Sequence, residues 1–151
     1  MPNLINSILD DHKSTTQILE RAASQVLLCR VAFRKKYIDD HQQECMLRAS
    51  ELYFSDDKGP VLYSISSLVL AELDEVEARH VESGVVPIGQ IFNYDLSKSD
   101  LYIERLKDNR LQQILNTHSN LFYHKRYKLW NGKRYIGLFK EIFNKESLTR
   151  C

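Results

Sequence analysis

Asn131 and Gly132 join two long, aromatic-rich runs, and this arrangement constrains the fold more than any other feature of the sequence. The two runs cover residues 120–130 and 133–144. Asparagine and glycine tolerate the positive φ angles of a two-residue hairpin turn, so an Asn-Gly pair between such runs is a strong hairpin signal. The sequence therefore predicts two long antiparallel strands.

The rest of the chain alternates between strand-like and helical patterns. Predicted strands cover residues 26–33, 45–54, 60–69 and 101–106, and a tight turn is expected at residues 56–59. Predicted helices cover residues 3–23, 71–80 and 110–115, with a short turn or helix from residue 87. The first helix is expected to break at Ser14 and Thr15, because either residue can cap a new helix. These elements predict an α+β fold, an antiparallel sheet of about six strands with helices on one face.

Length and charge limit the classes of protein to which the chain can belong. With 151 residues, 43% of them hydrophobic, the chain is expected to form a single domain spanning residues 1–151. Its 21 basic and 20 acidic residues give a net charge of +1, which lacks the basic excess typical of nucleic-acid binding. We expect no nucleic-acid partner, and a monomer or weak homodimer.

Motifs for metals, cofactors and membranes are missing from the sequence. The three cysteines have no metal-ligand spacing, the five histidines are scattered, and there is no phosphate-binding or dinucleotide motif. We therefore expect no metal and no cofactor. Reduced cysteines suit the cytoplasm, and neither a signal peptide nor an apolar run near ~18 residues is present. We expect a cytoplasmic protein without membrane contact.

Two charged residues interrupt otherwise apolar strands. Arg48 alternates with Met46 and Ser50, and Glu141 alternates with Phe139 and Phe143. Either charge can lie on a solvated outer face. Alternatively, the Arg48 guanidinium points into a pocket and clamps a carboxylate, and Glu141 lies near it as an acid, a base or a hydrogen-bond acceptor.

Two weaker signals accompany these charges. Gly89, which follows Pro87 and Ile88, would let the backbone approach a ligand, although such a sequence is usually only a turn. The basic run that contains Lys125 and Arg126 alternates with aromatic residues. It is either a strand with solvated charges or a nucleic-acid contact, and the first reading is favoured.

In order, these segments resemble the chorismate lyase family. The resemblance covers most of the chain and is carried by loose motifs whose order and separation match that family. They are Met46-Leu47-Arg48, Gly59-Pro60, Val86-Pro87-Ile88-Gly89-Gln90-Ile91-Phe92, the basic strand and Phe139-Lys140-Glu141-Ile142-Phe143. It implies an antiparallel sheet flanked by helices and a closed internal ligand site. It also implies cofactor-free conversion of chorismate to 4-hydroxybenzoate and pyruvate, a step of quinone biosynthesis.

The resemblance also implies roles for individual residues. Arg48 matches the arginine that binds the ligand carboxylate, and Glu141 matches the carboxylate that faces the ligand hydroxyl or ether oxygen. Ile88 and the backbone of Gly89 match the turn that contacts the ligand. Thr15 stands at a helix start where the family has a bulkier apolar residue.

One departure puts the substrate in doubt. Ile65 falls at or near the position of a second family arginine, and chorismate carries two carboxylates. Arg126 or Lys125 would then have to supply the second charge.

Two alternatives to a chorismate lyase remain open. The same fold serves as a non-catalytic, small-molecule-binding domain in transcription regulators that carry a winged-helix domain in front. Only about 24 residues precede the first predicted strand, which favours the enzyme. The other alternative is a lyase relative that makes a different aromatic acid or has lost activity.

Overall fold

A six-stranded antiparallel sheet is the framework of the computed structural model, which describes residues 4–10, 14–55, 57–84, 87–92 and 96–151. Its strands lie in the order β1-β2-β3-β6-β5-β4. They are β1 (Leu28–Ile38), β2 (Glu44–Tyr53), β3 (Leu62–Val69), β4 (Leu96–Lys107), β5 (Leu121–Asn131) and β6 (Arg134–Phe143). The predicted hairpin is confirmed, since β5 and β6 pair along their length, but Asn131 pairs with Arg134 as the last residue of β5, so the turn is Gly132–Lys133 and not Asn131–Gly132.

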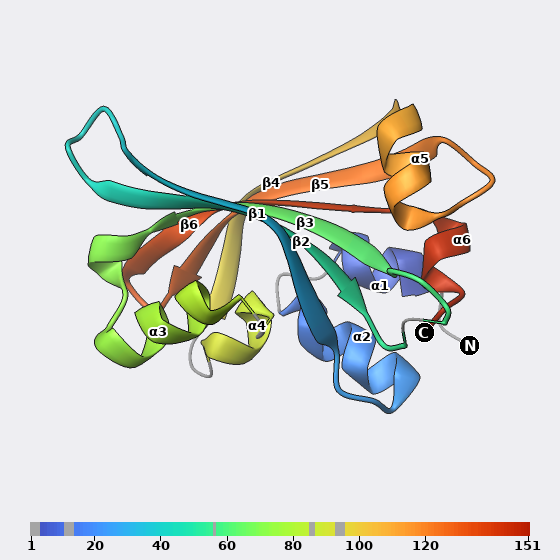
Figure 1. Ribbon diagram of the computed structural model, residues 1–151, viewed down its shortest axis with the longest axis horizontal. Coiled ribbons are helices and arrows are strands. Elements are labelled where there is room, and N and C mark those ends of the chain that lie inside the picture. The colour runs from blue at the N-terminus through green and yellow to red at the C-terminus, as the bar shows by residue number, and fades with distance from the viewer. Residues whose placement is uncertain (1–3, 11–13, 56, 85–86, 93–95) are drawn as a thin grey trace.

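Helices cover the two faces of this sheet unequally (Figure 1). On one face, called the inner face, lie α1 (Leu4–Asp10), α2 (Thr15–Ala23), α3 (Glu75–Ser83), α4 (Ile88–Ile91) and α6 (Lys145–Leu148). The remaining α-helix of the described chain, α5 (Asn109–Leu115), covers one end of the opposite, outer face. A short 3-10 turn, η1 (Leu70–Glu72), follows β3. The predicted α+β class is thus confirmed, with α5 on the second face as an addition.

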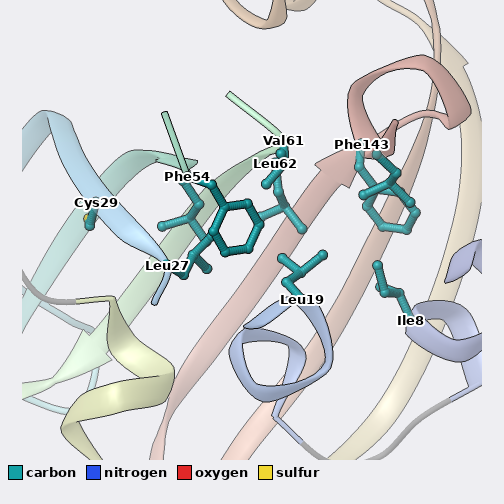
Figure 2. Close-up of a cluster of buried hydrophobic side chains, with 10 residues drawn as sticks. Ile8, Leu19, Leu27, Cys29, Phe54, Val61, Leu62 and Phe143 are labelled. Atoms are coloured by element: carbon teal, nitrogen blue, oxygen red, sulfur yellow. The ribbon is translucent and has the colours of Figure 1, made fainter. Parts of the chain in front are cut away.

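The inner face holds two apolar clusters. In the first, Leu19 of α2 and Ile8 of α1 pack against Leu62 and Phe143 of the sheet (Figure 2). In the second, α3 and α4 pack on the far half of the same face, over Tyr127 and Phe139 among others. The helices are therefore held by apolar burial on the sheet, which is worth roughly 25 cal/mol per Å².

Local capping explains where two of these helices begin and end. Ser14 caps α2, and its hydroxyl accepts a hydrogen bond from the Gln17 amide, as the expected break requires. Asp74 and Glu77 form a reciprocal capping box at the start of α3. Gly84 ends that helix with a φ of +73°, a left-handed conformation in which glycine avoids the steric cost of a Cβ.

Two strands extend beyond their predicted bounds. β1 continues to Ile38 and carries a bulge between Val31 and Phe33, and β4 begins at Leu96 with an irregularity between Ser99 and Tyr102. Of the sequence motifs, Asp56 and Val86 lie outside the described residues. No helix of the described ranges combines the length and the apolar character needed to cross a bilayer.

Candidate functional site

A pocket lies between the inner face of the sheet and the helices above it, because small side chains replace large ones there. Ser50 on β2 and Ser64 and Ser66 on β3 form its floor. The neighbouring inner-face positions, Leu52 and Leu68, carry large apolar side chains instead. Three serines on two adjacent strands thus leave a hollow with a polar floor. Its full lining is Ser14, Thr15, Thr16, Cys29, Arg48, Ser50, Leu52, Ser64, Ser66, Pro87, Ile88, Leu96, Lys98, Tyr127, Leu129, Phe139 and Glu141.

Arg48 provides the positive charge at the β2 end of the pocket. Its side chain is 1% exposed, and its Nη2 donates a hydrogen bond to the sulfur of Cys29 at 3.2 Å. Burial lowers the pKa of the Arg48 guanidinium from its ordinary value, because a charge is disfavoured away from water, and the nearby Cys29 opposes this shift. The guanidinium is thus held in a site that disfavours its own charge.

Glu141 lies at the opposite side of the pocket in a hydrogen-bonded cluster. Its side chain is 4% exposed, and its Oε1 accepts a hydrogen bond from the Thr15 hydroxyl at 2.7 Å. The same hydroxyl accepts a hydrogen bond from Lys98 Nζ at 2.7 Å, and that Nζ lies 3.8 Å from Glu141 Oε1. The cluster therefore links α2, β4 and β6 through one threonine hydroxyl.

Tyr127 completes this cluster from β5. Lys98 Nζ lies 4.5 Å from the centre of its ring, and the ring stacks on Phe139 with centroids 5.6 Å apart. Burial, followed by the charge of Glu141, raises the pKa of the Tyr127 phenol well above its ordinary value. The tyrosine is therefore neutral, and it gives the pocket a flat apolar wall with a polar tip.

Strand register fixes how Arg48 and Glu141 relate in space. Arg48 pairs with Ser66, and Glu141 pairs with Ser64 on the other edge of the same strand, β3. Two inter-strand spacings separate them, so their backbones are on the order of 10 Å apart. The two charged residues therefore stand on the two strands that flank β3, and both side chains line one hollow.

The roof of the pocket is made by the first turn of α2 and by the start of α4. Ser14, Thr15 and Thr16 come from α2, and Pro87 and Ile88 come from the α4 side.

These two roof elements are tied to each other at one point. Gln90 Nε2 donates hydrogen bonds to Glu20 Oε2 at 2.9 Å and to the Leu27 carbonyl at 3.1 Å. The two roof elements therefore form one hydrogen-bonded cover.

The structure brings together four of the residues that the sequence singled out. Arg48, Glu141, Thr15 and Ile88 all line the pocket. Gly89 lies next to Ile88 in α4.

The two proposed sources of a second charge lie elsewhere. The Lys125 ammonium points to the inner face but donates to the Ile8 carbonyl and does not line the pocket. Arg126 points to the outer face, where it pairs with Glu104 at 3.3 Å. Ile65 also lies on the outer face, in register between Ala49 and Lys140, so Ser64 and Ser66 occupy the pocket side of β3.

Sequence reasoning missed Lys98, the cation that accompanies Glu141. Lys98 lies between Ser97 and Ser99, so no apolar alternation marked it as part of a strand or as inward-facing. Tyr127 was seen only as part of the basic run, and the serines of the floor were not singled out. The sequence signal for this floor is a pair of serines, Ser64 and Ser66, at successive inward-facing positions of β3, where apolar residues are expected.

Among the residues described, no group of three or more His, Cys, Asp or Glu side chains is arranged to hold a metal ion. The chemistry of the pocket rests instead on two cations, one carboxylate, several hydroxyls and two aromatic rings.

Comparison with known proteins supports the fold and not a family. No family model matches the chain, and no curated protein matches its sequence. Among solved structures, the ligand-binding domain assigned to a GntR-family transcriptional regulator from Bordetella bronchiseptica aligns with 8% identity and a TM-score of 0.59, covering 78% of this chain and 85% of that one.

PhnF from Mycobacterium smegmatis aligns with 10% identity and a TM-score of 0.66, covering 91% of this chain and 66% of that one. Its effector domain alone aligns with 11% identity and a TM-score of 0.57, covering 89% of this chain and 90% of that one. The likeness to PhnF therefore extends over nearly the whole of its effector domain.

The expectation that this chain is a chorismate lyase is wrong on these findings. The similar structures named above are a regulator and the ligand-binding or effector domains of regulators. They point to a protein that is not an enzyme. The error has a physical cause. Fold-level motifs report the scaffold, and one scaffold can carry a site that only binds. Lyase activity, chorismate as the substrate and a role in quinone biosynthesis, which the resemblance implied, are therefore not supported.

Proposed function

We propose that this chain is a small-molecule-binding domain without catalytic activity, and that its ligand is a small aromatic carboxylate. The observation that carries the proposal is Arg48, a buried guanidinium that faces a hollow with a hydroxyl floor. The likeness to ligand-binding and effector domains supports the same function.

A carboxylate is the group that best satisfies the Arg48 end of the pocket. Burial disfavours the guanidinium charge, so an anion that enters the site recovers part of that cost. Guanidinium and carboxylate also match as planar groups that form two parallel hydrogen bonds. Among the described residues, the pocket lining contributes two cations and one carboxylate, Arg48, Lys98 and Glu141, a set suited to an anionic ligand.

The walls of the pocket favour a flat ligand. Tyr127 and Phe139 present two stacked rings beside the serine floor, and aromatic ligands pack on such surfaces by offset or edge contacts. At the far end, the Glu141, Thr15 and Lys98 cluster offers both an acceptor and donors to a ligand hydroxyl. The space open to the centre of a water molecule is about 40 Å³, roughly enough for three waters. A ligand of one ring is therefore the largest class that we propose.

Calorimetric titration with 4-hydroxybenzoate and its neutral analogue 4-hydroxybenzamide tests this function. We expect the acid to bind and the amide to bind at least tenfold more weakly, because only the acid pairs with Arg48. In an Arg48→Met variant this preference should vanish, and in the control variant Arg126→Met, altered on the outer face, it should persist.

Two outcomes contradict the proposal. If the unaltered protein binds acid and amide equally, the proposed contact between Arg48 and the ligand carboxylate is wrong, whether or not the Arg48 variant folds. Release of pyruvate from chorismate by the unaltered protein would remove the non-catalytic assignment.

A further inference from the structure

The outer face of the sheet presents an apolar surface that no described helix covers. We propose that this surface binds an acidic, amphipathic segment of another protein. The inference goes beyond the proposed function, because none of the residues involved lines the ligand pocket.

The surface is a stripe of four residues on adjacent strands, here called the outer stripe: Phe33, Leu47, Ile65 and Leu138. Strand register places Ala49 between Phe33 and Ile65, and Ser67 between Leu47 and Leu138, all on this face. Phe33 is 48% exposed and Leu138 is 49% exposed, while the two central residues are half-buried. Ser67, which is hydrogen-bonded to the Tyr37 hydroxyl, interrupts the stripe between Leu47 and Leu138. The four apolar side chains still share one sheet face, and apolar groups gathered on one face mark protein contacts.

The outer stripe continues an apolar contact that the protein already uses. Leu111 and Leu115 of α5 pack on Ala49, Tyr63 and Ile142 of the outer face, and Ile65 packs against that cluster. Figure 1 shows α5 over one end of the sheet only, on the side away from the other helices. The face therefore accepts a helix at one end and leaves equivalent apolar positions uncovered beyond it.

The charges around the outer stripe identify the chemistry of its partner. Three cations of this face are neutralised locally, in the pairs Arg30–Glu51, Arg126–Glu104 and Lys128–Asp100. Two more, Lys35 on β1 and Lys140 on β6, lie beside the stripe, and neither has a carboxylate partner among the residues that the structure describes. The uncompensated charge on this face is positive, so a complementary partner is acidic.

These lysines also argue against two other occupants. A second copy of the chain would bring its own Lys35 and Lys140 into the same interface, and like charges there are unfavourable. A single-stranded nucleic acid needs aromatic rings on which bases stack. The outer stripe has one aromatic member, Phe33 on the edge strand, and its other members, Leu47, Ile65 and Leu138, are aliphatic. Tyr102 already lies under the Arg126 guanidinium at 4.9 Å.

Sheet geometry sets the dimensions of the partner. Lys35 and Lys140 stand on β1 and β6, three inter-strand spacings apart, and Lys140 lies two residues along β6 from Leu138, which is level with Lys35. Their separation along this diagonal is about 16 Å. A helix rises 1.5 Å per residue and completes a turn in 3.6 residues, so carboxylates about eleven residues apart lie on the same face of one helix and reach both lysines. Apolar residues at helical spacing between them would meet the outer stripe.

The experiment uses the full chain and three synthetic peptides. The first is an amphipathic helix with a leucine face and glutamates about eleven residues apart on that face, the second has lysines in place of those glutamates, and the third has serines in place of the leucines. Methyl NMR spectra are recorded as each peptide is added. We expect only the acidic amphipathic peptide to shift the Leu47, Ile65 and Leu138 methyl signals, with at least tenfold tighter binding than the other two.

Charge-reversed variants test whether the two lysines are responsible. In Lys35→Glu/Lys140→Glu the preference should invert in favour of the basic peptide. The matched control, Lys133→Glu/Lys145→Glu, carries the same charge change at exposed positions elsewhere and should keep the original preference. Lys35, Lys133 and Lys145 are exposed and Lys140 is half-buried, so circular dichroism checks that the variants fold.

Several results overturn the proposal. If acidic and basic peptides bind equally, the surface has no preference for an acidic partner. If the preference is unchanged in the Lys35 and Lys140 variant, these two lysines do not cause it. Binding of an oligothymidylate that shifts the same methyl signals makes the face a nucleic-acid surface. A dimer in sedimentation equilibrium that Leu138→Glu dissociates makes it a self-association surface.

Discussion

The Thr15 hydroxyl accepts a hydrogen bond from Lys98 and donates one to Glu141, and so joins α2 to two strands of the sheet. Thr15→Val keeps the shape of the side chain and removes both bonds. We expect the free energy of unfolding to fall by about 1–3 kcal/mol, the usual cost of leaving buried polar groups without a hydrogen bond. Urea denaturation measures this.

The matched control is Thr16→Val, the same change one residue later, where the hydroxyl makes no side-chain hydrogen bond to any described residue. We expect it to change the free energy of unfolding by less than about 0.5 kcal/mol. If both variants lose the same stability, the hydroxyl of Thr15 has no special role in holding α2 to the sheet.

His124 is expected to make stability depend on pH. Its ring is 3% exposed on the outer face, and neither ring nitrogen has a hydrogen-bond partner among the described residues. Burial, aided by Lys140 and Arg126 and opposed by Asp108 and Glu104, lowers the pKa of His124 below its ordinary 6.5. The unfolded chain therefore takes up this proton first as the pH falls. The neutral ring makes its full contribution to the free energy of unfolding above about pH 6.5, and this contribution is lost as the pH falls from there towards the lowered pKa.

Urea denaturation between pH 5 and pH 7.5 checks this expectation. The unaltered protein should lose stability below pH 6.5 with a contribution of up to about 1.4 kcal/mol per pH unit from His124. His124→Leu should remove that contribution, whereas His118→Leu, on the exposed side chain beside Glu146, should not. A slope that survives in the His124 variant would assign the pH dependence to another group.

Sequence reasoning about single residues worked where a charge interrupts an apolar strand. Arg48 and Glu141 were singled out because their strand neighbours are apolar, and both line the pocket in the structure. Lys98 lies in a stretch of serines and charges, so its direction depends on the pairing of β4 with β5, which the sequence does not specify. Even the correct residues did not reveal whether the site catalyses or only binds.

At the scale of one element, Gly137 is the residue that lets β6 fit between its neighbours. It pairs with Leu68 of β3 and Leu129 of β5, and a Cβ built on it would overlap the Ser67 carbonyl oxygen. Because the obstacle is backbone, Gly137→Ala is expected to cost about 3 kcal/mol through overpacking. Thermal and urea denaturation measure this cost.

The comparison variant is Gly59→Ala, which separates steric overlap from backbone strain. Gly59 has a φ of +83°, but a Cβ there would meet only the end of the Arg150 side chain, at 3.5 Å. Its cost should be about 1 kcal/mol, that of a left-handed conformation alone. A Gly137 variant no less stable than the Gly59 variant would show that β6 can shift to make room.

Elements whose signals are local were predicted well. The β5–β6 hairpin was located by its Asn-Gly signal, although the turn is one residue later, at Gly132–Lys133. The division between α1 and α2 follows from the Ser14 cap. The C-terminal half of β1 was missed because residues 34–36 are three consecutive cations, so neither face is apolar. That half is an edge strand, and its exposed residues lack the alternation that marks a half-buried strand.

At the scale of the whole molecule, the sheet order depends on contacts between distant parts of the chain. The pairing of β3 with β6 inserts the C-terminal hairpin beside the N-terminal strands, with Tyr63 opposite Ile142. This pairing places Glu141 and Arg48 on the two sides of β3 and so creates the pocket. The six-strand α+β class was predicted from the sequence, but this long-range pairing has no local signal and was not.

One sheet carries all three apolar clusters, so the chain should unfold as a single unit. The first cluster joins α1, α2 and α6 to the sheet, the second joins α3 and α4 to it, and the third joins α5. All of them share β2, β3, β5 or β6, and loss of one exposes the strands of the others. We therefore propose one cooperative domain over residues 1–151.

The single tryptophan provides the test. Trp130 lies at the end of the β5–β6 hairpin, where its indole Nε1 donates to the Ser99 hydroxyl at 2.8 Å and its ring contacts Tyr135. Its fluorescence reports that end of the sheet, and far-ultraviolet circular dichroism reports the whole chain. We expect the two urea transitions to coincide, as two-state unfolding requires. The contrary result is a fluorescence midpoint at a lower urea concentration than the circular dichroism midpoint. It would mean that the half of the inner face under α3 and α4 unfolds independently of the half under α1, α2 and α6.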